Sequence, residues 1–297
     1  MTSSLDDSFM QELELCKAAV DERLDGFFTG DSSYGMLLES MRYSLMSAGK
    51  RIRAVICIKF CEAVGGTREA AMEAACAIEM LHAYSLIHDD LPCMDDDDMR
   101  RGLPSNHVKY GETTAVLAGD ALQAAAFETI LKSGLPATAI VKMACVLAEA
   151  AGPHGICGGQ YLDLNSDGTK LNADELMEIN SMKTAALLSA SASIGVIAGG
   201  GSSEQMQAAE GYAQAVGRAF QLRDDVLDCT ATTEQLGKTV GSDDKNNRVT
   251  YVTLLGVDAC KELIKEETSK AINALKGKFS DVGFLTWFAR ALAKRNK

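Results

Sequence analysis

Proline is scarce in this chain of 297 residues, and it occurs only four times, at Pro92, Pro104, Pro136 and Pro153. The sequence also lacks sustained runs of alternating β-branched residues, which argues against an extensive sheet. Residues with high helix propensity, such as Ala, Leu, Met, Glu and Lys, are abundant instead. The composition therefore predicts an all-α protein, and we expect one domain that spans residues 1–297.

Long apolar runs are absent as well. No stretch reaches the roughly 18 to 20 uninterrupted apolar residues that a membrane-spanning helix needs, and the apolar run 185–198 is short and rich in Ser, Ala and Gly. The first residues lack the basic-then-apolar order of a secretory signal and carry acids early. We expect a soluble, cytoplasmic protein without a membrane span.

The nine cysteines have neither the even number nor the spacing of a disulfide framework. Most lie among apolar residues of expected helices, where a thiol behaves as a small hydrophobic group. Cys57 and Cys61 share a helical face, but no second pair of ligands is nearby. We therefore predict neither disulfides nor a zinc site.

Positive charge is also in deficit, since the formal net charge is -12. Long-range repulsion would oppose the binding of nucleic acid, which we exclude as a partner. A small anionic substrate is still allowed if cations join it to the acidic side chains.

Apolar spacing and breakers place helices throughout the chain. We expect them at residues 5–28, 34–47, 52–64, 68–91, 112–133, 136–150, 154–164, 173–199, 204–228, 251–275 and 281–294. The two longer connections, 92–110 and 229–250, are rich in polar residues and are interpreted as functional loops.

Two acidic clusters end two of these helices. Six of the ten residues from Asp89 to Asp98 are Asp, and Asp224, Asp225 and Asp228 end the helix at 204–228. Negative charge at a helix C-terminus costs roughly 0.3–1 kcal/mol, so ordinary surface composition would avoid it. Clustered hard oxygen ligands favour Mg²⁺ or Ca²⁺, although the first cluster alone could be a solvated loop.

Neither cluster has the ligand order of a calcium-binding loop, so Mg²⁺ coordinated partly by phosphate oxygens is the better interpretation. Basic residues recur beside Gly, Asp and Thr and are candidates for phosphate contacts. They are Lys50, Arg51, Arg53, Arg100, Arg101, Lys183 and Lys238. Each one taken alone could be an ordinary surface residue.

Together these motifs resemble the trans-prenyltransferases, which include the farnesyl and geranylgeranyl diphosphate synthases, and most of all a bacterial-type farnesyl diphosphate synthase. The resemblance runs from about Gly49 to the C-terminus. It rests on GKRIR at 49–53, EMLHAYSLIHDDLPCMDDDDMRRG at 79–102, HVKYGETTAVLAGDAL at 107–122, GGQYLDL at 158–164, MKT at 182–184, FQLRDDVLD at 220–228 and LGKTVGSD at 236–243.

The resemblance implies a helical bundle of the isoprenoid synthase type around a central cavity, with both acidic clusters at its mouth. It also implies metal ligands for three Mg²⁺ ions, namely Asp89, Asp95 and Asp224, supported by Asp90, Asp225 and Asp228. Arg100, Lys183, Gln221 and Lys238 would contact the allylic diphosphate or its metal shell. Isopentenyl diphosphate would be held by Lys50, Arg53, His82 and Arg101. Oxygens near Lys183, Thr184 and Gln221 could stabilise an allylic carbocation.

Some features of the match are unusual. Asp89 and Asp95 are six residues apart, about 600° of helix, so they share a site only if the helix is distorted, for which Pro92 is a candidate cause. Ala54 stands where the family commonly has Pro, and Arg248 stands where Lys is common.

We expect condensation of isopentenyl diphosphate with dimethylallyl or geranyl diphosphate to give farnesyl diphosphate. Tyr84 lies about 7–8 Å along the helix from Asp89 and is the candidate floor that stops chain growth. Geranylgeranyl diphosphate synthesis is the alternative. A non-catalytic regulatory subunit and an acidic calcium buffer are alternatives of other classes. We also expect a homodimer, with residues 115–131 as its interface.

Overall fold

The computed structural model describes residues 2–166, 170–230 and 249–295. Helices make up nearly all of its regular structure, and in these residues the only sheet is a hairpin of two strands. The all-α prediction is therefore confirmed. The described chain divides into two compact units.

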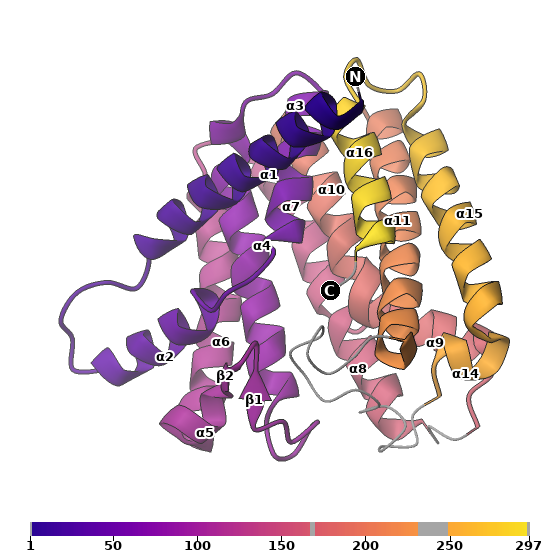
Figure 1. The fold of residues 1–297 in the computed structure, drawn as a ribbon. Coiled ribbons are helices and arrows are strands. Elements are labelled where there is room, and N and C mark those ends of the chain that lie inside the picture. The colour runs from indigo at the N-terminus through magenta and orange to yellow at the C-terminus, as the bar shows by residue number, and fades with distance from the viewer. Residues whose placement is uncertain (1, 167–169, 231–248, 296–297) are drawn as a thin grey trace. The chain divides into compact units, whose positions relative to one another are not determined.

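The first unit comprises Met1–Leu147 and Ile194–Gly201. Its elements are α1 (Thr2–Asp25), α2 (Gly35–Leu45), α3 (Ile52–Ala63), α4 (Arg68–Asp89), β1 (Met99–Arg100), β2 (Leu103–Pro104), α5 (Asn106–Tyr110) and α6 (Glu112–Leu131), with most of α7 (Ala137–Ala151) and the end of α10 (Ala186–Ala198). The central helix is α4, which packs along α6 and α3 (Figure 1). Both α3 and α4 are buried on most sides, as their apolar composition requires.

The second unit comprises Ala148–Ser193 and Ser202–Lys297. Its elements are α8 (Ile156–Asn165), α9 (Ala173–Asn180), η1 (Ser181–Ala185), the start of α10, α11 (Ser203–Thr230), α14 (Tyr251–Leu255), α15 (Val257–Leu275) and α16 (Gly283–Lys294). The long helix α11 packs against α15 and α16 (Figure 1). Tyr212 on α11 is fully buried, and its hydroxyl donates to the carbonyl of Leu285 at 2.8 Å, which ties α11 to α16.

Most expected helix ends differ from the structure by up to three residues, and three of the expected segments differ in kind. The helix expected at 251–275 is interrupted at Gly256, whose φ of +83° is left-handed, so α14 and α15 are separate. The helix expected at 173–199 contains a π-helical turn, η1. The loop expected at 92–110 contains β1, β2 and α5.

Two helical stretches, Ala137–Asn165 and Ala173–Ala198, have the length and apolar composition of a membrane-spanning helix. Core helices pass the same test, and 61% of the apolar window of the second stretch is buried inside the protein. The absence of a membrane span therefore stays a prediction.

Candidate active site

The first acidic cluster begins where α4 ends. Asp89 is the last residue of α4, and the backbone N–H of Asp95 donates to the carbonyl of Asp89 at 2.9 Å. The turn is closed by the N–H groups of Met94 and Asp96, which donate to the carbonyl of Leu91 at 2.8 and 3.2 Å. Asp89 and Asp95 are thus neighbours because the chain reverses after the helix. The departure from helical geometry between them is the end of α4 at Asp89, three residues before Pro92.

The buried Asp90 of this turn forms an ion pair with the partly exposed Arg100 on β1. Asp90 is 2% exposed and accepts a hydrogen bond from Arg100 Nε at 2.9 Å, while Arg100 Nη2 also reaches Asp97 at 3.1 Å. Asp90 therefore holds Arg100 in place. This contact supports a structural role for Asp90 and leaves its expected part in metal binding a prediction.

Arg100 and Arg101 are presented by the β1–β2 hairpin. Arg100 pairs with Leu103, so Arg101 and Gly102 form a two-residue turn, and both have left-handed φ values of +54° and +78°. The guanidinium of Arg101 donates to Ser47 Oγ at 3.1 Å and to the Ser47 carbonyl at 3.3 Å. A Cβ at Gly49 would lie 2.9 Å from Arg101 Nη1. A side chain at position 49 would therefore displace the guanidinium of Arg101 from this place.

Arg53, His82 and Arg101 concentrate positive charge in the first unit. Arg53 Nη1 lies 3.3 Å from His82 Nε2. A guanidinium can only donate, so Nε2 accepts and the neutral imidazole carries its proton on Nδ1. Burial, together with the charges of Arg53 and Arg101, holds the pKa of His82 well below its usual value. The ring is therefore neutral at pH 7.

The charge of this cluster is not fully compensated. Burial lowers the pKa of the Arg53 guanidinium to about 10, so it is still charged at neutral pH. Within the described part of the chain, the buried Arg53 Nε has no hydrogen-bond partner. Burial also lowers the pKa of Arg101. Lys50 lies three residues before Arg53 and immediately before Arg51, the residue preceding α3. A buried donor among cations is suited to bind an anion such as a diphosphate.

Tyr84 is buried in the first unit, one and a half turns before the end of α4. It is 6% exposed, and its ring meets the ring of His88 edge-on at 5.4 Å. His88 in turn lies against α6, with Nε2 3.0 Å from the Val116 carbonyl. A Cβ at Gly119 would approach His88 Nε2 to 2.1 Å, so this contact depends on glycine.

In the second unit, three predicted residues line one pocket. Lys183, Thr184 and Gln221 surround a volume of about 170 Å³, together with Asp163, Leu176, Ile179, Asn180, Asp225, Val249 and Thr250. Lys183 and Thr184 lie on the π-helical turn η1, a local irregularity that is frequent at functional sites. Lys183 Nζ is paired with Asp163 at 2.6 Å. The motif GGQYLDL contains this Asp163, which sequence reasoning did not assign.

Hydrogen bonds and an ion pair fix two residues of the second acidic cluster, Asp224 and Asp225. Asp225 accepts from Gln221 Nε2 at 3.0 Å and from the backbone N–H of Tyr251 at 2.8 Å, so both of its carboxylate oxygens are engaged. Asp224 pairs with Arg295 at 2.6 Å. Asp228 lies one turn further along α11.

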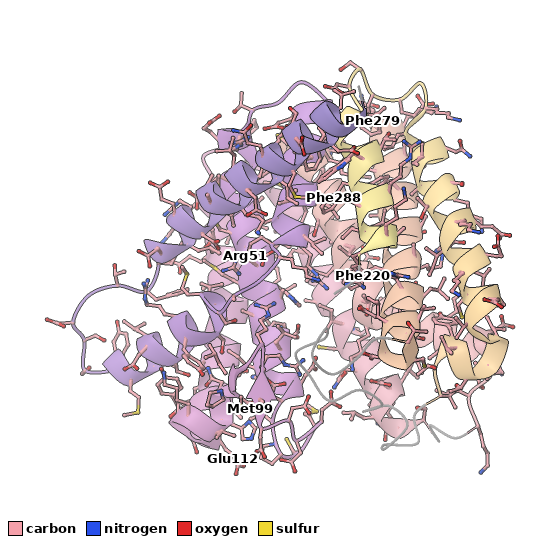
Figure 2. All side chains as sticks on the ribbon, in the orientation of Figure 1. Arg51, Met99, Glu112, Phe220, Phe279 and Phe288 are labelled. Carbon is pink, nitrogen blue, oxygen red and sulfur yellow. The ribbon has the colours of Figure 1, made fainter. Side chains whose placement is uncertain are left out.

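Arg295 was missed by sequence reasoning. Its guanidinium lies 3.6 Å from the ring centroid of Phe220, which Figure 2 labels on α11, and it donates to the Phe220 carbonyl at 3.0 Å. The basic run at 294–297 was the only signal, and basic C-termini are common. Another candidate, Lys238, lies outside the described residues, so its role stays a prediction.

The donor set fits Mg²⁺. Among the residues that the structure describes, no three His, Cys, Asp or Glu side chains converge on one point. Mg²⁺ does not need such a cage, because it is usually held by one or two carboxylates, water and substrate phosphates. Asp89 and Asp95 in the first unit and Asp224 in the second carry carboxylates of that kind, and their part in metal binding stays a prediction.

An all-helical chain with acidic clusters at helix ends, and with basic and amide side chains around them, has the features of a trans-prenyltransferase. Residues 35–285 match the polyprenyl synthetase family, and the chain belongs to that family. This confirms the expected resemblance and makes the chain a prenyltransferase with isoprenoid diphosphate substrates.

Similar proteins and solved structures also support membership of this family. Geranylgeranyl pyrophosphate synthase 3, chloroplastic, of Arabidopsis thaliana is 48% identical over 245 residues, 80% of this chain and 68% of the relative. The geranylgeranyl pyrophosphate synthase, chloroplastic, of Capsicum annuum is 47% identical over 242 residues, 80% and 66% of the two chains.

Geranylgeranyl pyrophosphate synthetase from Pyrococcus horikoshii superposes with a TM-score of 0.90 at 30% identity and covers 97% of this chain and 99% of its own. An FPP/GFPP synthase from Zymomonas mobilis gives a TM-score of 0.87 at 30% identity, with the same coverage.

Proposed function

We propose that this short-chain prenyl diphosphate synthase makes geranylgeranyl diphosphate from isopentenyl diphosphate and allylic diphosphates. The observation that carries the proposal is the set of curated relatives at 43–48% identity, whose names are geranylgeranyl pyrophosphate synthases or their large subunits. The non-catalytic subunit considered above is disfavoured, because both acidic clusters of this chain are intact.

The residues of the first unit are suited to bind isopentenyl diphosphate. Arg53 and Arg101 lie beside a neutral His82, and the buried Arg53 Nε supplies a donor for a diphosphate oxygen. Lys50 adds charge at the start of α3. Because these groups are partly withdrawn from water, each charge-assisted hydrogen bond contributes more than it would in solvent.

The allylic diphosphate is assigned to Asp89, Asp95 and Asp224, which would hold Mg²⁺. The metal would neutralise the charge of the pyrophosphate that leaves when the C–O bond to the allylic carbon breaks. Lys183, Thr184 and Gln221 line a pocket whose oxygens are suited to stabilise a positively charged allylic carbon. The double bond of isopentenyl diphosphate then attacks this carbon. The proton lost afterwards can pass to the released pyrophosphate, so no dedicated side-chain base is required.

The second candidate is farnesyl diphosphate synthesis, the product expected from the sequence. The buried Tyr84, held edge-on against His88, favours it, because a fixed aromatic ring five residues before Asp89 could block a longer hydrocarbon chain. The names of the relatives support the geranylgeranyl product more strongly.

Product chromatography separates the two candidates. The protein is incubated with labelled isopentenyl diphosphate, Mg²⁺ and, in turn, dimethylallyl, geranyl or farnesyl diphosphate. We expect a C20 product from every primer. A reaction that stops at C15 and leaves farnesyl diphosphate unused would replace the proposal by the farnesyl candidate.

We also propose a homodimer. Along α6, in the expected interface 115–131, three large apolar side chains are exposed, namely Val116, Leu117 and Leu131. Exposed apolar side chains gathered on one helix are typical of a contact surface. Sedimentation equilibrium should give twice the chain mass of 31.6 kDa, and a Leu117→Glu variant should shift toward the monomer.

A further inference from the structure

Arg51 is the middle basic residue of the motif GKRIR. Its charge alone made it a candidate for a phosphate contact, and the family resemblance gives it no role. It lies between Lys50 and Arg53, both assigned to isopentenyl diphosphate. Arg51 is 5% exposed and precedes α3 with a left-handed φ of +49°. Such a conformation is strained for a residue with a side chain and persists only where surrounding contacts hold it.

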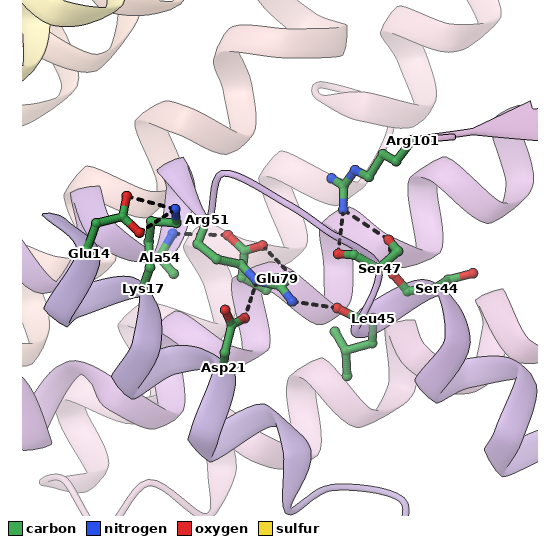
Figure 3. A network of polar contacts seen from close by, with 10 residues as sticks. All are labelled: Glu14, Lys17, Asp21, Ser44, Leu45, Ser47, Arg51, Ala54, Glu79 and Arg101. Atoms are coloured by element: carbon green, nitrogen blue, oxygen red, sulfur yellow. Dashed lines mark hydrogen bonds and ion pairs between the residues drawn. The ribbon is translucent and has the colours of Figure 1, made fainter. Parts of the chain in front are cut away.

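Three contacts hold Arg51, as Figure 3 shows. Its Nε donates to Asp21 at 2.7 Å, Nη1 lies 3.3 Å from Glu79, and Nη2 donates to the carbonyl of Leu45 at 2.8 Å. These partners come from α1, α4 and the end of α2. The guanidinium therefore joins three helices at the point where α3 begins.

Glu79 has a second function in this network. It is 3% exposed, and its other carboxylate oxygen accepts a hydrogen bond from the backbone N–H of Ala54 at 3.2 Å. That N–H is one of the donors that a helix leaves unsatisfied at its start. Glu79 thus caps α3 one residue beyond Arg53 and balances the charge of Arg51.

Asp21 connects α1 to Arg51 and so to the start of α3. It is the half-exposed partner of Arg51, with 45% of its side chain accessible. Asp21 and Arg51 line a groove of about 620 Å³ between α1 and residues 46–51, which include Gly49 and Lys50. The N-terminal helix, which carries no family motif, therefore borders the segment that holds the predicted diphosphate ligands.

We propose that Asp21, Arg51 and Glu79 form a positioning network that fixes the start of α3, so that Lys50 and Arg53 are held ready for the diphosphate of isopentenyl diphosphate. The inference rests on the proposed function, which assigns Lys50 and Arg53 to that substrate. None of the three network residues needs to touch the substrate. They hold Lys50 and Arg53 in place, and a small displacement of such binding groups lowers the affinity for substrate and the rate steeply.

The decisive variant is Asp21→Asn, which removes one half-exposed charge and keeps the shape of the side chain. Its matched control is Glu73→Gln, which removes an ion pair between α1 and α4 that does not include Arg51, Arg23 to Glu73 at 2.8 Å. Steady-state kinetics should show the KM for isopentenyl diphosphate raised about tenfold in Asp21→Asn, with kcat and the KM for geranyl diphosphate within about twofold of wild type. The control should match the wild type in all three constants.

Arg51→Lys extends the test, because lysine keeps the charge but cannot contact Asp21, Glu79 and Leu45 at once. We expect it to raise the same KM. The inference is overturned if Asp21→Asn leaves this KM unchanged, if it raises both KM values equally, or if Glu73→Gln has the same effect.

Binding of inorganic pyrophosphate to metal-free protein in EDTA gives a readout that does not depend on turnover. We expect Asp21→Asn to bind it about tenfold more weakly than the wild type and Glu73→Gln to bind it equally well. Equal affinities in Asp21→Asn and wild type would overturn the network. A wild type without prenyl transfer would instead overturn the proposed function, and the binding comparison would still decide on the network.

Discussion

At the scale of single residues, two adjacent arginines that look alike in the sequence have different charged and polar partners in the structure. Arg100 is paired with the buried Asp90, whereas Arg101 donates to Ser47 and adds to the charge around Arg53. Adjacent arginines of one hairpin therefore have different surroundings. Sequence reasoning assigned them to different substrates by resemblance, and the structure supplies a physical difference between them.

Arg101→Ala should raise the KM for isopentenyl diphosphate by about tenfold or more, because a charge-assisted contact is worth roughly 1.5–3 kcal/mol. The KM for geranyl diphosphate should change little. Arg100→Ala should instead lower the free energy of unfolding by about 1–3 kcal/mol, since it leaves the buried Asp90 without its partner. Kinetics and urea denaturation measure both. Equal changes in the two KM values for Arg101→Ala would show that the assignment is wrong.

His82 should make stability depend on pH. Its pKa is lowered in the folded protein, so between pH 6.5 and 5 the unfolded chain binds a proton that the folded chain does not. The contribution of His82 to the free energy of unfolding is therefore complete above pH 6.5. Below that pH, the free energy of unfolding falls by up to about 1.4 kcal/mol per pH unit. Urea denaturation of wild type and His82→Gln at pH 7 and 5 tests this. The variant should lose less stability, and an identical loss would contradict the account.

Tyr84→Ala tests the second candidate function. If the wild type stops mainly at C15, truncation should open apolar space and yield appreciable C20 or longer product from geranyl diphosphate. The products are compared by chromatography, with circular dichroism to verify that the variant is folded. A wild type that already makes C20, or an unchanged C15 profile in the variant, would reject Tyr84 as the floor.

At the scale of elements, apolar spacing predicted every long helix but not the local irregularities. Gly256 interrupts a regular pattern through its left-handed φ, and Ser181–Ala185 winds as a π-helix within an otherwise helical segment. Neither changes the apolar spacing. The break at Gly256 is a change of backbone conformation at one residue, and the π-helical turn lies against Gly159, which is distant in the chain. The β1–β2 hairpin has only two residues in each strand, too few for an alternating pattern.

The π-helical turn depends on a close contact with α8. A Cβ at Gly159 would lie 2.4 Å from the backbone nitrogen of Lys183, so Gly159→Ala must push η1 away and displace Lys183 and Thr184. We expect kcat to fall by about tenfold or more and the melting temperature to drop by several degrees.

The control for this substitution is Gly211→Ala on α11, where the added Cβ would meet only Ala274 Cβ at 3.8 Å. A helix interior gains up to about 1 kcal/mol from that exchange, so the control should be as stable as the wild type or more so, with unchanged kcat. A normal kcat in folded Gly159→Ala would show that catalysis does not depend on the position of η1.

At the scale of the whole molecule, each compact unit contains part of the predicted site. The first contains Asp89, Asp95 and the cations around Arg53, and the second contains Asp224 and the pocket with Lys183. Sequence motifs identified these residues because the motifs follow one another along the chain in the same order as in the family. The joining of both acidic clusters in one site stays a prediction.

What the sequence could not reveal are the partners of these groups. Asp163 beside Lys183, Arg295 beside Asp224, and Asp21 with Glu79 around Arg51 become visible only when helices distant in the chain pack together. The net charge of -12 conceals the opposite local charge around Arg53. Composition thus argued against nucleic acid as a partner but could not locate this cluster of cations.

The most direct test of the account is the turnover of Asp89→Ala and Asp224→Ala with isopentenyl and geranyl diphosphate at saturating Mg²⁺, with circular dichroism to verify folding. Both carboxylates are assigned to the metal ions that neutralise the departing pyrophosphate, so either loss should cut kcat by about a hundredfold or more. Exposed Asp258→Ala on α15 is the control and should keep wild-type turnover. Near-normal turnover in folded Asp89→Ala or Asp224→Ala would contradict the account.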